Sequence, residues 1–256
     1  MSESDAESEA PAAADIPGAG SVDPKDHPPR PFPDVDWSWF LGRAVALGIP
    51  DAAARREKLE ALYGHLIGVN AWLNLTRITA PRDYLKQHIL DSLTAVGDTR
   101  LRHLADGSPC VDLGSGGGYP GLPLALWHPT IPWVLADARK KKAEFLASAA
   151  TLTGAKVTAR HLRGGEAAHA APDLYKRCQL VVSRAMGQAD AVLAEAGPLL
   201  RLSGHCLIFK GPAFAGDERS TAITNAPKMG FKFISERRIT LEPGDPDRVI
   251  AVFQRS

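Results

Sequence analysis

The residues best placed to bind a ligand lie between Cys110 and Gly121, in the run Cys-Val-Asp-Leu-Gly-Ser-Gly-Gly-Gly-Tyr-Pro-Gly. The apolar start of this run predicts a buried strand, and the residues from Pro120 to Trp127 predict the opening of a helix. Glycines let a backbone approach a ligand closely, and the free N–H groups at a helix start point at negative charge. This stretch is therefore a predicted binding loop.

An acidic residue further along the chain indicates what the loop binds. Residues 133–136 predict a second strand that stops at Asp137. A carboxylate about twenty residues after a glycine loop can accept hydrogen bonds from both hydroxyls of a ribose. The ligand is therefore expected to carry a nucleoside.

Two cofactor classes fit a glycine loop of this kind. Residues 116–121 satisfy the dinucleotide pattern G-x-G-x-x-G, which is weakly specific on its own. Asp112 followed by Gly114, Gly116 and Gly118 fits S-adenosylmethionine better, because an acidic strand end suits an ammonium group rather than a pyrophosphate. We favour S-adenosylmethionine over NAD, and a glycine turn that binds nothing is the remaining alternative.

Composition and charge limit the classes of protein. The chain has 256 residues, 45% of them hydrophobic, which is enough for one domain with additions and a substantial core. Residues 1–36 hold nine acidic and two basic residues, a net charge of −7, so the other 220 residues carry +8 of the overall +1. A basic body suits a polyanionic partner. The three scattered cysteines predict buried reduced thiols and no metal site.

The first 36 residues are rich in Ser, Ala and Glu and then in Pro, which predicts a disordered acidic tail. They lack the basic start and apolar segment of a secretory signal. No run approaches the roughly eighteen apolar residues that span a bilayer. We therefore expect a cytoplasmic protein without a membrane partner.

Hydrophobic periodicity predicts the fold class. Residues 37–106 predict a helical N-terminal extension, including a helix over 81–96. Residues 107–256 alternate strands with helices, which predicts a parallel sheet covered on both faces. Strand-like runs at 232–241 and 248–254 predict a terminal antiparallel hairpin. The expected fold is therefore α/β and Rossmann-like, of the kind found in S-adenosylmethionine-dependent methyltransferases.

Five motifs occur in an order that resembles a known family. They are Asn74-Leu-Thr-Arg-Ile-Thr, His88-Ile-Leu-Asp-Ser, Asp112-Leu-Gly-Ser-Gly-Gly-Gly-Tyr-Pro-Gly-Leu-Pro, Ser183-Arg-Ala and Phe209-Lys-Gly. They are similar to motifs of the bacterial small-subunit ribosomal RNA guanine-N7 methyltransferases, also called glucose-inhibited division protein B. The resemblance implies transfer of a methyl group from S-adenosylmethionine to N7 of one guanine in 16S rRNA, on the RNA or the small ribosomal subunit.

The resemblance also implies roles for individual positions. The positions expected to contact the cofactor are Gly114, Gly116, Gly118, Tyr119, Asp137, Gly165, Glu166 and Arg184. Of these, Asp137 would hold the ribose, while Gly165 and Glu166 would flank the adenine. Arg163 stands one position earlier than the arginine of the family motif, which would make the adenine loop one residue longer.

Arg184 and Lys210 are the predicted catalytic residues. Guanine N7 has a free lone pair, so its methylation needs no general base, and the rate would come from orientation of the reactants. Arg184 would orient the guanine or a flanking phosphate, and Lys210 would contact a backbone phosphate. His88 and Asp91 lie three positions apart on a predicted helix face, and we expect a structural pair.

Other functions stay open. A methyltransferase of the same fold acting on a small molecule or a protein would be active without RNA and show little salt dependence. A non-catalytic factor that binds S-adenosylmethionine or assembling ribosomes would bind the cofactor without turnover. The basic run at 139–142 could bind RNA phosphates or form a solvated helix face. We expect a monomer.

Overall fold

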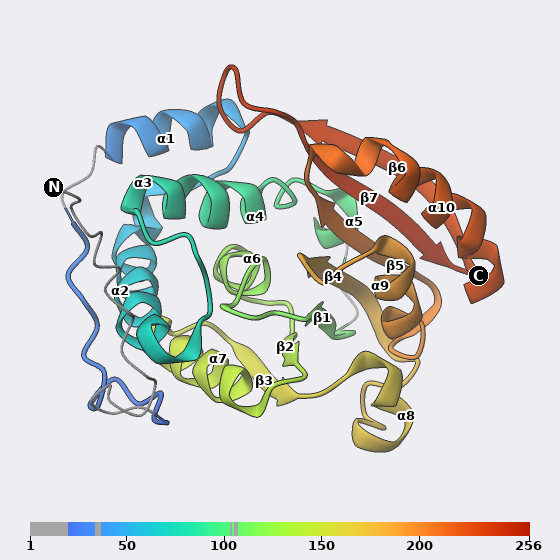
Figure 1. Cartoon of the computed structure of the whole chain (residues 1–256), viewed down its shortest axis with the longest axis horizontal. Coiled ribbons are helices and arrows are strands. Elements are labelled where there is room, and N and C mark those ends of the chain that lie inside the picture. The colour runs from blue at the N-terminus through green and yellow to red at the C-terminus, as the bar shows by residue number, and fades with distance from the viewer. Residues whose placement is uncertain (1–19, 34–36, 103, 105–106) are drawn as a thin grey trace, which may run out of the picture.

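A seven-stranded sheet forms the centre of the protein in a computed structural model that describes residues 20–33, 37–102, 104 and 107–256 (Figure 1). The strand order is β3-β2-β1-β4-β5-β7-β6. The strands are β1 Cys110–Leu113, β2 Trp133–Asp137, β3 Val157–His161, β4 Cys178–Arg184, β5 Leu200–Lys210, β6 Phe231–Ile239 and β7 Arg248–Arg255.

The first five strands are parallel, and β7 reverses direction. It pairs antiparallel with both β5 and β6, so it is inserted between them. The predicted mostly parallel sheet with a terminal antiparallel pair is confirmed. The insertion of β7 places its first residue beside the end of β5, where Lys210 pairs with Val249.

Helices cover both faces of the sheet. The helices are α1 Trp37–Ala46, α2 Arg56–Leu73, α3 Pro81–Asp83, α4 Asp91–Leu93, α5 Thr99–Arg102, α6 Gly121–Trp127, α7 Lys140–Thr153, α8 Ala167–Ala170, α9 Ala189–Ala196 and α10 Asp217–Asn225. Shorter helical turns are η2 Ala53–Arg55, η4 Gly164–Glu166, η5 Pro212–Ala215 and η6 Ala226–Met229, and η3 Tyr84–Leu90 is π-helical.

The two faces carry different numbers of layers. Val111 and Leu113 of β1 point to the face covered by α9 and α10, while Cys110 points to the face covered by α6. On the α6 side, α1 and α2 form a further layer, because their apolar residues share one buried cluster with those of α6 and α7. Figure 1 shows α1 and α2 on one side of the molecule and β6 and α10 on the other. The N-terminal helices are therefore an added layer without a core of their own.

The predicted helix over residues 81–96 contains an unpredicted change of geometry. Its central segment η3 is π-helical, and α3 and α4 flank it without a break. Apolar spacing does not reveal this change, although π-helical turns occur frequently at functional sites. Helix α10 was not predicted either, because it buries only Ala222 and so has no apolar stripe.

Part of the predicted tail is packed on the body. His27 is buried and accepts a hydrogen bond from the Trp72 indole nitrogen at 3.1 Å. The Arg30 N–H donates to the Gly64 carbonyl, and a Cβ on Gly64 would lie 2.3 Å from the Arg30 oxygen. The expectation of disorder therefore does not hold for residues 20–33, whose aromatic and backbone groups find partners on α2. The rest of the tail lies outside the described residues.

Candidate active site

The glycine loop leaves β1 in left-handed backbone conformations. Gly114, Gly116 and Gly118 have φ values of +70°, +58° and +96°. At Gly114 a Cβ would also lie 2.6 Å from the Met186 sulfur. Glycine is therefore needed there both for the backbone angle and for the space beside Met186.

Asp112 holds this loop from inside the protein. The side chain is fully buried, and its Oδ2 accepts hydrogen bonds from Ser115 Oγ at 2.6 Å and from the Gly121 N–H at 2.8 Å. Burial raises the pKa of Asp112 to about 6, although these hydrogen bonds and Arg184 act to lower it. It lines none of the cavities described below. Oδ2 of Asp112 therefore closes the turn, whereas the buried Oδ1 has no hydrogen-bond partner among the described residues, and a contact with the ammonium group of a cofactor stays a prediction.

Asp137 lies at the end of β2, where it faces the loop. Its Oδ2 accepts a hydrogen bond from the Gly116 N–H at 2.9 Å, and its Oδ1 accepts one from the Arg139 N–H at 2.8 Å. Carboxylate oxygens have further acceptor capacity, and this residue borders the adjoining cavities. A ribose contact at Asp137 stays a prediction with which this position beside the cavities is compatible.

Two adjoining cavities of about 570 and 300 Å³ border the loop, and we call them together the loop cavity. Residues shared by both parts are Gly114, Asp137, Lys142 and Ala185. The larger part extends to the apolar side chains of Leu162 and Met186, and the smaller part to Thr76 and Tyr119. The loop cavity therefore runs past the glycine loop from Leu162 and Met186 to Thr76 and Tyr119, with charged residues such as Asp137 and Lys142 along it.

The predicted adenine contacts lie beside this cavity rather than in its lining. Gly165 and Glu166 are exposed, and residues 162–164 contribute the lining instead. The Gly165 N–H donates to the Glu195 carboxylate at 2.8 Å. The lining therefore lies just before the predicted pair. Adenine contacts at Gly165 and Glu166 stay a prediction that the geometry does not favour.

Arg184 ends β4, next to β1, where the strand order reverses and ligands of α/β proteins bind. Its Nη1 donates to the Gln87 carbonyl at 2.7 Å and to Asp91 Oδ2 at 2.9 Å. Its Nη2 donates to His88 Nδ1 at 2.9 Å. The Tyr119 ring lies 5.5 Å from the guanidinium carbon and stacks on His88 at a centroid distance of 4.2 Å. Arg184 is therefore held in one orientation by groups from several elements.

His88 acts as a neutral acceptor for Arg184. Because a guanidinium only donates, His88 Nδ1 must accept, and the ring proton lies on Nε2, which donates to Thr76 Oγ1 at 2.8 Å. Burial and then the charge of Arg184 lower the pKa of His88 to about 3. The expected pairing of His88 with Asp91 is corrected, since the two side chains share Arg184 as their partner.

The loop after α2 is held by Asn70, which the sequence analysis did not single out. Its Oδ1 accepts hydrogen bonds from the backbone N–H groups of Leu75 and Thr76 at 2.8 and 2.9 Å. Its Nδ2 donates to the Thr76 carbonyl at 3.0 Å. These bonds place Thr76 against His88 and beside the loop cavity. The sequence signal for this role is an asparagine four positions before the helix break at Asn74, because Asn side chains often bond to nearby backbone groups.

A further cavity of about 320 Å³ adjoins the loop cavity at Arg184, and we call it the arginine cavity. Its lining residues are Ile78, Gln87, His88, Asp91, Arg184, Ala185, Phe209, Lys210, Gly211 and Arg248. His88, Arg184 and Ala185 also line the loop cavity. Ala185 has a φ of +57°, which is unusual for a residue with a side chain and occurs at functional sites. Ligands in the two cavities would therefore meet at Arg184.

Lys210 lines the arginine cavity but is already paired. Its Nζ lies 2.5 Å from Glu218 Oε1 of α10 and also donates to the Gly187 carbonyl. Only 10% of its side chain is exposed. A phosphate would have to compete with this ion pair, so a phosphate contact at Lys210 stays a prediction that the geometry does not favour.

The basic run at 139–142 is divided between roles. Arg139 and Lys142 line the loop cavity. Lys141 instead pairs with Glu144 at 2.8 Å and donates to the Gly20 carbonyl at 2.7 Å. The run is therefore neither a uniformly solvated face nor a continuous phosphate-binding strip.

Two further observations concern the chemistry that the described residues offer. Cys110, Cys178 and Cys206 are buried free thiols, as predicted. Among the described residues, no three His, Cys, Asp or Glu side chains converge in a way that could hold a metal ion.

Within the same ranges, no helix combines the length and the apolar character needed to cross a bilayer.

The strand order, the glycine loop after β1 and the acidic end of β2 together define a Rossmann-like methyltransferase. Residues 55–231 match the GidB family model, described as rRNA small subunit methyltransferase G. The chain therefore belongs to this family, and the resemblance drawn from its motifs is confirmed. The matched region ends before the loop between β6 and β7 and does not include α1.

Curated relatives agree with this assignment. The Ribosomal RNA small subunit methyltransferase G of Sorangium cellulosum is 36% identical over 193 residues, which is 73% of this chain and 79% of that protein. The protein of the same name from Myxococcus xanthus is 31% identical over 213 residues, covering 82% of this chain and 93% of the relative. A solved structure of a predicted O-methyltransferase from Agrobacterium tumefaciens aligns with a TM-score of 0.49 and 17% identity, over 66% of this chain and 79% of that chain.

Proposed function

We propose that this chain transfers the methyl group of S-adenosylmethionine to N7 of a guanine in 16S ribosomal RNA. Family membership supports RNA of the small subunit as the substrate. The observation that carries the proposal is the position of Arg184, a guanidinium held rigidly where the loop cavity and the arginine cavity meet. This is the place where a cofactor and a target base would be adjacent.

The loop cavity suits S-adenosylmethionine in its shape and in its polar groups. Asp137 would accept hydrogen bonds from the ribose hydroxyls, and the apolar end near Leu162 and Met186 would receive the adenine. The backbone of residues 114–117 would border the amino-acid part. When bound, this cofactor supplies an electrophilic methyl group.

The residues around the arginine cavity fit a reaction that moves no proton. Guanine N7 attacks with its own lone pair, so no base has to act on it. His88 cannot readily take up a proton there, because Arg184 occupies its Nδ1 and its pKa is about 3. The task left to the protein is to hold the reacting atoms at a near-attack distance of about 3–3.5 Å.

Arg184 can orient the guanine without blocking N7. Hydrogen bonds to Gln87, His88 and Asp91 engage three of its donors, which leaves others for a ligand. Guanine presents O6 and N7 as acceptors on the same edge. A donor bound to O6 would fix the base while the N7 lone pair stays available.

A methyl-transfer assay tests the proposal. Purified protein and labelled S-adenosylmethionine are incubated with small ribosomal subunits from a strain that lacks the protein, and the RNA is then cleaved at N7-methylguanine. We expect label at a single guanine of 16S rRNA. Transfer to a small molecule or a protein without RNA would contradict the proposal, and cofactor binding without any transfer would favour a non-catalytic factor.

A further inference from the structure

The arginine cavity contains more positive than negative charge. Lys210 is neutralised by Glu218. Arg184 and Arg248 share the single carboxylate of Asp91, whose Oδ2 lies 2.9 Å from Arg184 and whose Oδ1 lies 3.8 Å from Arg248. Two arginine charges in the lining thus face one carboxylate charge, so one positive charge is left without a negative partner in the lining. Methylation of guanine would add a further positive charge, so this cavity suits a ligand that brings an anion with it.

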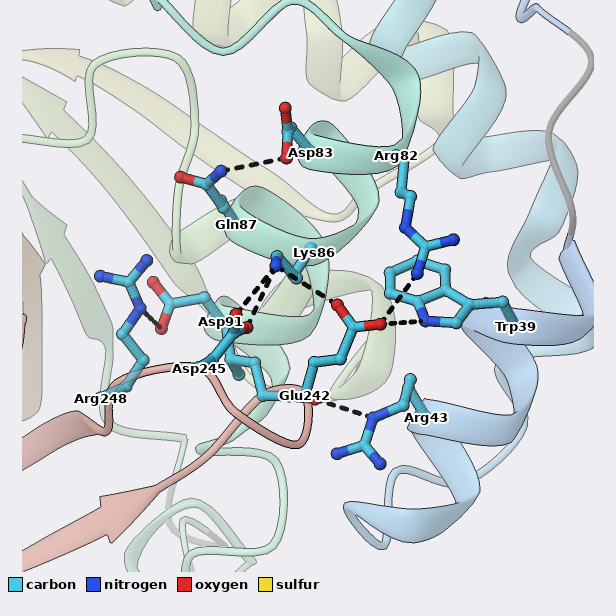
Figure 2. A network of polar contacts seen from close by, with 11 residues as sticks. Trp39, Arg43, Arg82, Asp83, Lys86, Gln87, Asp91, Glu242, Asp245 and Arg248 are labelled. Carbon is cyan, nitrogen blue, oxygen red and sulfur yellow. Dashed lines mark hydrogen bonds and ion pairs between the residues drawn. The ribbon is translucent and has the colours of Figure 1, made fainter.

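Arg248 is the less engaged of the two arginines. Figure 2 shows Arg248 beside Asp91, and the distance of 3.8 Å between them exceeds hydrogen-bond length. The Arg248 side chain is 32% exposed, compared with 15% for Arg184. As the first residue of β7, it lies at the end of a strand that borders the cavity. Arg248 is therefore able to accept a new partner from solvent, whereas Arg184 is not free to turn.

We propose that Arg248 binds a backbone phosphate of the RNA beside the target guanine, while Arg184 binds the base. A guanidinium presents parallel donors that match two phosphate oxygens, and it remains charged at all physiological pH values. The phosphate would balance the charge that Asp91 leaves uncompensated. This inference rests on the proposed function, because it requires RNA in the arginine cavity. It also assigns to Arg248 the phosphate contact predicted for Lys210.

The loop that precedes Arg248 is anchored to the N-terminal helices. Glu242 of this loop accepts a hydrogen bond from the Trp39 indole nitrogen at 2.9 Å and pairs with Lys86 of η3 at 3.3 Å (Figure 2). The segment η3 also presents Gln87 and His88 to Arg184. The phosphate-binding and base-binding arginines would therefore be positioned by the same helical segment.

The test compares Arg248→Gln with Arg238→Gln in the full chain. Arg238 lies on the adjacent strand, pairs in register with Val249, and lines no part of the arginine cavity. Each variant loses one positive charge. We measure binding to small ribosomal subunits over a range of salt concentrations, kcat and KM for methyl transfer, and cofactor affinity.

A phosphate contact predicts that Arg248→Gln lowers the slope of log affinity against log salt by about 0.7–1. We expect KM for the subunits to rise about tenfold while kcat and cofactor affinity change less than about twofold, and Arg248→Lys should restore most of the slope. Arg238→Gln should leave all values near wild type. An unchanged slope for Arg248→Gln, or the same change in both variants, would overturn the inference.

The same measurements separate this inference from the proposed function. Wild-type protein that binds subunits but methylates no guanine would contradict the proposed function, and the slopes would still decide the role of Arg248. Wild-type protein that methylates a guanine with an Arg248-independent slope would contradict the inference alone. An absence of any binding to RNA would overturn both.

Discussion

The loop cavity and the arginine cavity meet at Arg184, yet they are built in different ways. The loop cavity is centred on the glycine loop, whose left-handed backbone shapes it, and segments between Leu75 and Glu195 complete its lining. The arginine cavity is lined by polar and charged side chains from η3, α4, β4, β5 and β7, and its ion pair between Asp91 and Arg248 joins residues that lie far apart in the chain. Substitutions that alter the backbone of the glycine loop should therefore act mainly on the loop cavity. Substitutions that remove a charge should act mainly on the arginine cavity.

The largest expected effect is that of Arg184→Ala. Loss of orientation should lower kcat on the order of 100-fold, while cofactor affinity stays within about threefold of wild type. Removing one partner of a buried pair should also lower the free energy of unfolding by about 3 kcal/mol, because Asp91 then keeps only the more distant Arg248 as a partner. Steady-state kinetics, cofactor titration and urea unfolding measure the three quantities.

Arg160→Ala is a matched control for this variant. It removes an ion pair of 2.8 Å with Asp173 on the surface, outside both cavities. It should leave kcat unchanged. An equal loss of kcat and cofactor affinity in Arg184→Ala would show that the arginine belongs to the cofactor site and would erase the distinction between the cavities.

The pH dependence of folding stability should also differ between Asp112, beside the glycine loop, and His88, beside Arg184. Folding raises the pKa of Asp112 beside the glycine loop to about 6, so stability from this group is lost as the pH rises from about 4 to about 6. Folding lowers the pKa of His88 to about 3, so the folding stability that neutral His88 contributes is lost as the pH falls below about 6.5. Asp112→Asn keeps the acceptor for Ser115 and Gly121 and removes only the first effect.

Asp112→Asn should therefore gain stability relative to wild type as the pH rises. We expect the difference in the free energy of unfolding to grow by about 2 kcal/mol between about pH 4 and about pH 7. Urea unfolding at several pH values measures it, and any pH-independent cost of the amide cancels in the comparison. Parallel stability curves for the two proteins would contradict the raised pKa.

A smaller effect is expected for Gly114→Ala. The left-handed φ of +70° and the displacement of Met186 into the loop cavity should weaken cofactor binding about tenfold. At saturating cofactor, kcat and the affinity for subunits should stay within about threefold. Gly154→Ala imposes a similar φ of +65° with nothing within 4 Å of the new Cβ, so it should leave cofactor affinity unchanged. A larger effect on RNA binding than on cofactor binding would reverse the assignment of the cavities.

The smallest effect is expected for Glu242→Gln, which weakens the anchor between the last loop and the N-terminal helices. Because Glu242 is partly exposed, the free energy of unfolding should fall by no more than about 1 kcal/mol. KM for subunits should rise about twofold with cofactor affinity unchanged, because the anchor positions only the arginine cavity. A change in cofactor affinity alone would contradict this assignment.

Much of the fold could be predicted from short-range patterns. Alternating apolar runs predicted the strands and most helices, and the spacing of Gly114, Gly116 and Gly118 predicted the loop that the structure contains. Adenine contacts at Gly165 and Glu166 stay a prediction, and the sequence could not show that residues 162–164 line the cavity instead, because an exposed turn carries no periodic signal. The composition of the tail predicts disorder, but His27 accepts a hydrogen bond from Trp72 of α2, a contact that composition cannot reveal.

By itself, the sequence determined the binding loop, the acidic end of β2 and the family, because backbone angles and strand ends depend on residues near one another in the chain. Only the tertiary structure decided which charges are available. It paired Lys210 with Glu218, fixed Arg184 on η3 and α4, and left Arg248 weakly engaged. The physical reason is that the environment of a charge is set by whichever segments fold against it, and these lie far apart in the sequence.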